Sequence, residues 1–225
     1  MSFEKRFKAA IFDMDGTMTD TMYVWESLSN RYLVKHGITP PPDLNEKLGI
    51  LGVHKAAEFL RSEFSLPKTP EQIFAELVEV LNDYYQLPHP LRPGTVFLLS
   101  ELKKRQVTTA VLSATVLRPV KTSLKTAGID GFFDYIFSTE DMPYSKVKPQ
   151  AFIDTAARIG AVPEETIVFE DALYAIESAK SAGFTVCAVP DHTAEFPETI
   201  RQLADIYLAD FSEFPLHWFA DGSCR

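Results

Sequence analysis

Short apolar runs recur along this chain, and most of the stretches between them have the spacing and composition of helices. The runs are typical of buried strands, and they cover residues 9–13, 108–113, 135–138, 166–170, 185–189 and 206–208. Strands that alternate with helices predict βαβ units, in which the strands form a parallel sheet between layers of helices. We therefore predict an α/β fold.

Glycines mark the ends of three of the predicted helices. The helical patterns at residues 116–127, 150–159 and 172–182 stop at Gly128, Gly160 and Gly183. Glycine is favoured just after a helix because it adopts the left-handed backbone conformation without strain. These stops support the division into strands and helices.

The first two strands are separated by far more chain than one crossover needs. Residues 21–87 contain helical patterns at 22–36, 46–51, 53–64 and 70–85, with no convincing strand, and a proline-rich linker follows at residues 88–93. We predict a helical insertion at residues 21–87, with residues 1–20 and 88–225 forming the core. Such an insertion could lie over the carboxyl edge of the sheet as a lid.

Composition limits the classes of partner. The 225 residues carry a net charge of −9, which disfavours nucleic acids and anionic membranes as partners. No apolar run approaches the roughly 20 residues that span a bilayer, and the first residues lack a hydrophobic signal region. The two cysteines, Cys187 and Cys224, indicate no disulfide framework. We expect a cytoplasmic protein, a monomer or weak homodimer.

Polar residues stand at or near the ends of several predicted strands. They are Asp13, Asp15, Ser113, Lys146, Glu170 and Asp171. The carboxyl ends of the strands are where open α/β sheets bind ligands, so we expect these side chains to meet. Neighbouring carboxylates repel unless a cation lies between them, and oxygen ligands favour a hard ion such as Mg²⁺. The pattern predicts a site for an anion such as phosphate, together with a divalent metal.

Each of these residues has a simpler explanation when it is taken alone. Asp15-Gly16 is a common turn, Asp171 suits the N-terminus of a helix, and Ser113 could be an ordinary strand-end residue. Lys146 and Lys148 could belong to a solvated basic loop. The occurrence of the complete set, in order and near strand ends, favours the functional interpretation.

Four motifs resemble those of the haloacid dehalogenase superfamily of phosphohydrolases. They are Asp13-Met14-Asp15-Gly16-Thr17, Ser113, Lys146 and Phe169-Glu170-Asp171-Ala172. Residues 146–183 are similar to the β-phosphoglucomutase-like branch over their whole length. The resemblance implies a Rossmann-like, doubly wound parallel sheet with an inserted all-helical cap, and phosphatase chemistry.

The resemblance also implies roles for the motif residues. Asp13 would attack phosphorus to form an aspartyl-phosphate, and Asp15 would protonate the leaving alcohol and then deprotonate water. Ser113, the amide of Ala114 and Lys146 would bind the phosphoryl group.

The same resemblance implies a metal site and leaves one lysine ambiguous. Mg²⁺ would be held by Asp13, by the carboxylate of Asp171 and by the main-chain carbonyl of Asp15. Glu170 would either bind the metal directly or contact the residues that bind it. The family often has Lys-Pro where this chain has Lys146-Val147-Lys148-Pro149, so Lys148 remains an alternative to Lys146.

The predicted insertion bears on the reaction and the substrate. Trp25 stands where the mutase of the branch has a histidine, which favours hydrolysis, and Asp15 argues against dehalogenation. Trp25, Gly52, His54 and Lys55 are candidates for substrate recognition. We expect a phosphorylated small molecule, such as a sugar phosphate or nucleotide. A hexose-phosphate mutase and a non-catalytic phosphometabolite-binding protein remain alternatives.

Overall fold

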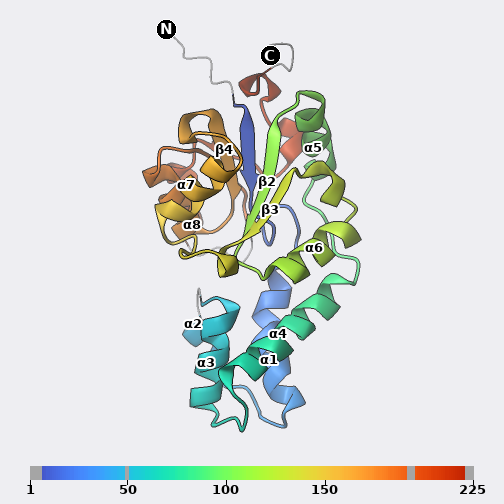
Figure 1. Cartoon of the computed structure of the whole chain (residues 1–225), viewed down its shortest axis with the longest axis vertical. Coiled ribbons are helices and arrows are strands. Elements are labelled where there is room, and N and C mark those ends of the chain that lie inside the picture. Colours follow the sequence, from blue (N-terminus) through green and yellow to red (C-terminus); the bar gives the residue numbers. More distant parts are fainter. Residues whose placement is uncertain (1–6, 49–50, 192–195, 221–225) are drawn as a thin grey trace.

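A six-stranded parallel sheet forms the centre of the molecule (Figure 1). The computed structural model describes residues 7–48, 51–191 and 196–220. Its strands are β1 (Ala9–Phe12), β2 (Thr108–Ser113), β3 (Tyr135–Ser138), β4 (Thr166–Glu170), β5 (Thr185–Ala188) and β6 (Ile206–Tyr207). Their order in the sheet, β3-β2-β1-β4-β5-β6, is that of a Rossmann-like fold. The predicted fold class is confirmed, and each predicted strand lies within one residue of its observed position.

Helices cover both faces of the sheet because successive side chains of a strand point to opposite faces. Ala10 and Phe12 of β1 belong to the apolar core that includes α5 (Thr95–Lys104) and α6 (Leu117–Thr126). Ala9 and Ile11 belong to the opposite core. The helices on that face are α7 (Pro149–Arg158), α8 (Leu173–Ser181) and α9 (Pro197–Leu203). Strand β1 is therefore buried on both faces.

Most predicted helices are observed, with differences at their ends. Gly128, Gly160 and Gly183 have positive φ angles after α6, α7 and α8, as predicted. The helix predicted at 46–51 instead covers Leu44–Leu48 (α2), beginning at a buried leucine, and residues 49–50 lie outside the described part. Helices α5 and α9 were not predicted: α5 follows the proline-rich linker directly, and α9 has only seven residues.

Four consecutive helices lie beyond the carboxyl ends of the strands (Figure 1). They are α1 (Met22–Lys35), α2, α3 (Val53–Glu63) and α4 (Pro70–Tyr85). The two connections to the sheet run side by side, because the amide of Asp20 donates to the carbonyl of Pro90 at 3.0 Å and that of Arg92 to Met18 at 2.8 Å. The helical layer thus begins and ends at one point next to β1.

The cysteines and the apolar character of the helices are two further points on which the structure bears. Cys187 is buried in β5, whereas Cys224 lies outside the described part of the chain. Within residues 7–48, 51–191 and 196–220, no helix is both long and apolar enough to cross a membrane.

Candidate active site

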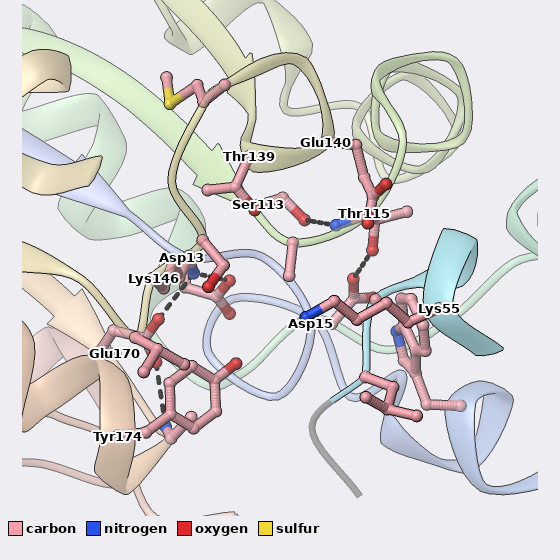
Figure 2. Close-up of a pocket in the computed structure, with 18 of the residues that line it drawn as sticks. Asp13, Asp15, Lys55, Ser113, Thr115, Thr139, Glu140, Lys146, Glu170 and Tyr174 are labelled. Carbon is pink, nitrogen blue, oxygen red and sulfur yellow. Dashed lines mark hydrogen bonds and ion pairs between the residues drawn. The ribbon is translucent and has the colours of Figure 1, made fainter. Parts of the chain in front are cut away.

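The predicted site residues line one cavity of about 710 Å³ between the strand ends and the helical layer (Figure 2). From the sheet side come Asp13, Asp15, Ser113, Ala114, Lys146, Lys148, Glu170 and Asp171, and from the helical layer Trp25, Gly52, His54 and Lys55. Strand order explains the convergence. Strand β1 pairs with β2 on one side and β4 on the other, so the loops after β1 and β4 flank the point where the order reverses.

Lys146 is the buried cation of the site. Its side chain is 2% exposed, and its ammonium donates to Asp13 Oδ1 and, at 2.6 Å, to Glu170 Oε1. Burial lowers the pKa of Lys146, but the Asp13 and Glu170 carboxylates more than offset this, so that the pKa is raised. Lys148 is exposed at the N-cap of α7. The geometry therefore favours Lys146 over Lys148 as the lysine next to the carboxylates.

Three carboxylates form a compact cluster around this ammonium group. Asp13, Glu170 and Asp171 each offer an oxygen, and these atoms lie within 4.8 Å of one another. If all three carboxylates are ionised, the single ammonium leaves two negative charges uncompensated in a buried site. Asp13 Oδ2 is buried and has no hydrogen-bond partner among the described residues. Excess charge, oxygen donors and an unpartnered buried oxygen fit a hard divalent cation such as Mg²⁺.

Burial and mutual repulsion raise the proton affinity of this cluster. Burial raises the pKa of Asp13 to about 7; Lys146 opposes the rise, and Glu170 and Asp15 add to it. Burial, with the Glu170 and Asp13 charges, also raises the pKa of Asp171 well above its ordinary value. A cation bound here would favour the ionised carboxylates.

Glu170 and Asp171 are held by different partners. Glu170 Oε2 accepts the amides of Asp171 and Ala172 at 2.8 and 2.9 Å, so both of its oxygens are engaged. Asp171 Oδ1 accepts the hydroxyl of Thr17 at 2.8 Å. The N-cap of α8 is Ala172, without a side-chain cap, so helix capping does not account for Asp171.

Gly16 allows the first loop to approach this cluster. Its φ of +84° suits glycine, and a Cβ atom there would lie 2.4 Å from Asp171 Oδ2. The glycine in the Asp15-Gly16 turn is therefore required by both its conformation and its close approach to Asp171.

Asp15 lies apart from the ion cluster and is held by hydroxyl groups. Its Oδ1 accepts hydrogen bonds from Thr21 and Tyr85, both at 2.6 Å, and its Oδ2 accepts one from Thr115 at 2.8 Å. Ser113 Oγ accepts the Thr115 amide at 3.0 Å. Thr21, Tyr85 and Thr115 were not predicted from the sequence, because no spacing or motif connects them to Asp15.

The helical layer approaches the sheet at Glu140, which follows β3 and is a further residue that the sequence did not predict. His54 stacks on Phe74 with ring centroids 3.7 Å apart, and its Nε2 lies 3.8 Å from Glu140 Oε2. Burial raises the pKa of Glu140, while His54 opposes the rise. The Lys55 side chain extends from α3 toward the strand ends (Figure 2).

Among known proteins, two relatives of this chain are phosphatases, and a solved structure shares its fold. A chain of 26% identity over 219 residues, covering 95% of this chain and 96% of the relative, is hexitol phosphatase B of Escherichia coli (strain K12). Another of 26% identity, covering 78% and 82%, is a phosphorylated carbohydrates phosphatase of Thermotoga maritima. The crystal structure of CbbY from Rhodobacter sphaeroides in complex with phosphate shares the fold, with a TM-score of 0.77 at 24% identity, covering 92% of this chain and 96% of that one.

The family assignment rests on a match over most of the chain. The family model described as haloacid dehalogenase-like hydrolase matches residues 7–183, which include all four motifs. The predicted resemblance and the predicted enzyme class, a hydrolase, are confirmed. This chain belongs to the haloacid dehalogenase-like hydrolase family.

Proposed function

We propose that this protein is a Mg²⁺-dependent phosphatase that hydrolyses a small-molecule phosphomonoester through an aspartyl-phosphate on Asp13. The observation that carries the proposal is the position of Asp13, in contact with buried Lys146 in the cavity that Asp15 also lines. A nucleophilic carboxylate, a phosphate-binding cation and a separate proton carrier are the groups that such a reaction needs. The names of the relatives, which are phosphatases, support it.

In this proposal, the nucleophile, the phosphate-binding groups and the proton carrier are separate residues. Asp13 attacks phosphorus while Lys146, Ser113 and the amide of Ala114 bind the phosphoryl oxygens. Asp15 gives a proton to the leaving oxygen and takes one from the water that releases phosphate. Lys146 also favours the ionised form of Asp13, since its charge opposes the effect of burial on the Asp13 pKa.

The metal would be held by Asp13, Asp171 and the main-chain carbonyl of Asp15. Both carboxylate oxygens of Glu170 already accept hydrogen bonds, one from Lys146 and the other from two backbone amides. Glu170 would therefore orient the metal-binding residues without contacting the metal itself. Mg²⁺ would stabilise the negative charge of the phosphoryl group.

We propose residues 21–87 as a cap that selects the substrate, with residues 1–20 and 88–225 as the catalytic core. Trp25, Gly52, His54 and Lys55 would contact the part of the substrate beyond its phosphate. A sugar phosphate or nucleotide suits a cavity of about 710 Å³ with both apolar and polar lining, and the two relatives' names favour a sugar phosphate.

The test is phosphate release from a panel of phosphorylated metabolites. Purified protein with Mg²⁺ should release phosphate, chelation should stop it, and Asp13→Asn should lower kcat at least about 1,000-fold because the nucleophile is lost. The exposed Asp130→Asn is the matched control and should keep full activity. Undiminished turnover by Asp13→Asn would overturn the assignment of the nucleophile.

The same panel separates the alternatives. Trp25 lines the cavity but has no nitrogen that accepts a proton, which supports hydrolysis over transfer to a second sugar hydroxyl. Conversion of glucose 1-phosphate to glucose 6-phosphate with little phosphate release would show a mutase. Binding without turnover of any compound, p-nitrophenyl phosphate included, would show a non-catalytic protein.

A further inference from the structure

Three hydroxyl groups from separate segments of the chain converge on Asp15. We call Thr21, Tyr85 and Thr115 the hydroxyl triad. Thr21 and Tyr85 each donate to Oδ1 at 2.6 Å, and Thr115 donates to Oδ2 at 2.8 Å, a contact visible in Figure 2. At most 1% of each triad residue is exposed, so water does not compete for these bonds.

The triad joins both ends of the helical insertion to the sheet. Thr21 is the residue before α1, Tyr85 is the last residue of α4, and Thr115 follows β2. Thr21 stands at the N-cap of α1, but its side chain makes no cap hydrogen bond and instead donates to Asp15. A residue type that ordinarily caps a helix thus contacts Asp15 here.

The two oxygens of Asp15 are not equivalent. A carboxylate oxygen has two lone pairs, and two hydroxyl donors use both of those on Oδ1. Oδ2 accepts only the Thr115 hydroxyl among the described residues, so one of its lone pairs remains available. Asp15 lines the cavity, and a hydrogen bond from a substrate or water to its carboxylate would use this remaining lone pair of Oδ2.

We propose that Tyr85 and Thr21 are positioning residues that saturate Oδ1 of Asp15 and so make Oδ2 the atom that carries the proton. This inference rests on the proposed function. In the first step, the Oδ2–H bond breaks and the proton passes to the leaving oxygen as its bond to phosphorus breaks and Asp13 binds phosphorus. In the second, a water proton passes to Oδ2 while the water oxygen binds phosphorus and the bond to Asp13 breaks.

A pair of substrates that differ in their need for a proton tests this assignment. p-Nitrophenolate leaves readily without protonation, whereas the phenolate of phenyl phosphate is a poorer leaving group of similar shape. In Tyr85→Phe, kcat/KM for phenyl phosphate should fall by about 10- to 100-fold, because the proton is misplaced. For p-nitrophenyl phosphate it should fall by less than about 3-fold, because phosphorylation of Asp13 then depends little on Asp15.

The neighbouring tyrosine provides a matched control. The hydroxyl of Tyr84, on the same helix, is buried without a hydrogen-bond partner among the described residues. Tyr84→Phe should therefore leave both kcat/KM values within about 3-fold of the wild type. If Tyr85→Phe lowers both substrates equally, or neither by more than Tyr84→Phe does, the positioning proposal is overturned.

Asp15→Asn separates this proposal from the function on which it rests. If that variant keeps wild-type kcat/KM for phenyl phosphate, Asp15 carries no proton and both proposals fail. If that variant loses activity toward phenyl phosphate while Tyr85→Phe matches Tyr84→Phe, only the positioning proposal fails.

Substitutions at Thr21 test the same proposal if the Tyr85→Phe variant does not fold. Thr21→Val removes the other donor to Oδ1, whereas Thr21→Ser keeps a hydroxyl. The valine variant should show the same selective loss on phenyl phosphate, and the serine variant should recover most of it. Equal activity of the valine and serine variants on phenyl phosphate would contradict the proposal.

Discussion

Lys146 is the residue on which the balance of charge in the cavity depends. Its ammonium lies between Asp13 and Glu170, and all three side chains are at least nine-tenths buried. Removing one partner of a buried ion pair leaves the other charge without compensation, which costs about 3–5 kcal/mol. Lys146 therefore affects the stability of the folded state, and in the proposed function it would also bind the phosphoryl group.

A pair of lysine variants tests this residue. Lys146→Gln should lower kcat on p-nitrophenyl phosphate by about 100- to 1,000-fold, the usual effect of removing a group that stabilises transition-state charge. Lys148→Gln is the matched control, because that side chain is exposed, and it should stay within about 3-fold of the wild type. A larger loss for Lys148→Gln would transfer the phosphate-binding role to that lysine.

At the level of elements, the N-terminus of α3 meets the sheet through Glu140. The Glu140 carboxylate lies at the first turn of α3, with its Oε2 atom 3.8 Å from His54 Nε2. Gly52 has a φ of −64°, which any residue adopts, but a Cβ atom there would lie 2.3 Å from Glu140 Oε1. This glycine is explained by the close approach of the carboxylate and not by its backbone conformation.

We predict that Gly52→Ala and Glu140→Ala have the same effect. Each should raise KM by about 3- to 10-fold, the equivalent of losing a carboxylate from a helix N-terminus. The double variant should be no worse than either single variant, because both remove one contact. Gly131→Ala, at a glycine with open space around it, is the control. Additive effects of the two substitutions in a double-mutant cycle would contradict this explanation.

For the whole molecule, pH should control how strongly Mg²⁺ stabilises the fold. The Asp13 pKa is raised to about 7, so the metal-free protein should lose stability as pH rises from the ordinary carboxyl range to that value. Metal ligands must be ionised, so the stabilisation by Mg²⁺ should increase over the same interval. The metal and the raised pKa therefore act on stability in opposite directions.

Thermal unfolding with and without Mg²⁺ measures this effect. The increase in Tm on adding Mg²⁺ should be larger at about pH 8 than at about pH 5.5, by roughly 3–6 °C for each tenfold gain in affinity, since a tenfold gain is about 1.4 kcal/mol. In Asp13→Asn the increase should be smaller, and its dependence on pH weaker, because the titrating carboxylate is gone. An equal increase at both pH values in the wild type would contradict the prediction.

The sequence by itself determined the sheet, most of the helices and the residues of the four motifs. Apolar runs and glycine stops are local signals, and they fixed each strand to within one residue. The motif residues could be predicted because their types are tied to strand ends, where parallel strands bring them together. The same local signals missed α5 and α9, which follow proline-containing segments.

Only the tertiary structure decided which groups hold those motif residues in place. Tyr85 and Thr115 reach Asp15 from 70 and 100 residues away in the chain. Glu140 likewise meets His54 only because α3 lies over the carboxyl ends of the strands. Such contacts depend on how whole elements pack, and no local pattern of residues encodes them. The sequence therefore identified residues that meet in one cavity at the strand ends, whereas the packing of the helical layer on the sheet determined how Asp15 is oriented and what shape that cavity has.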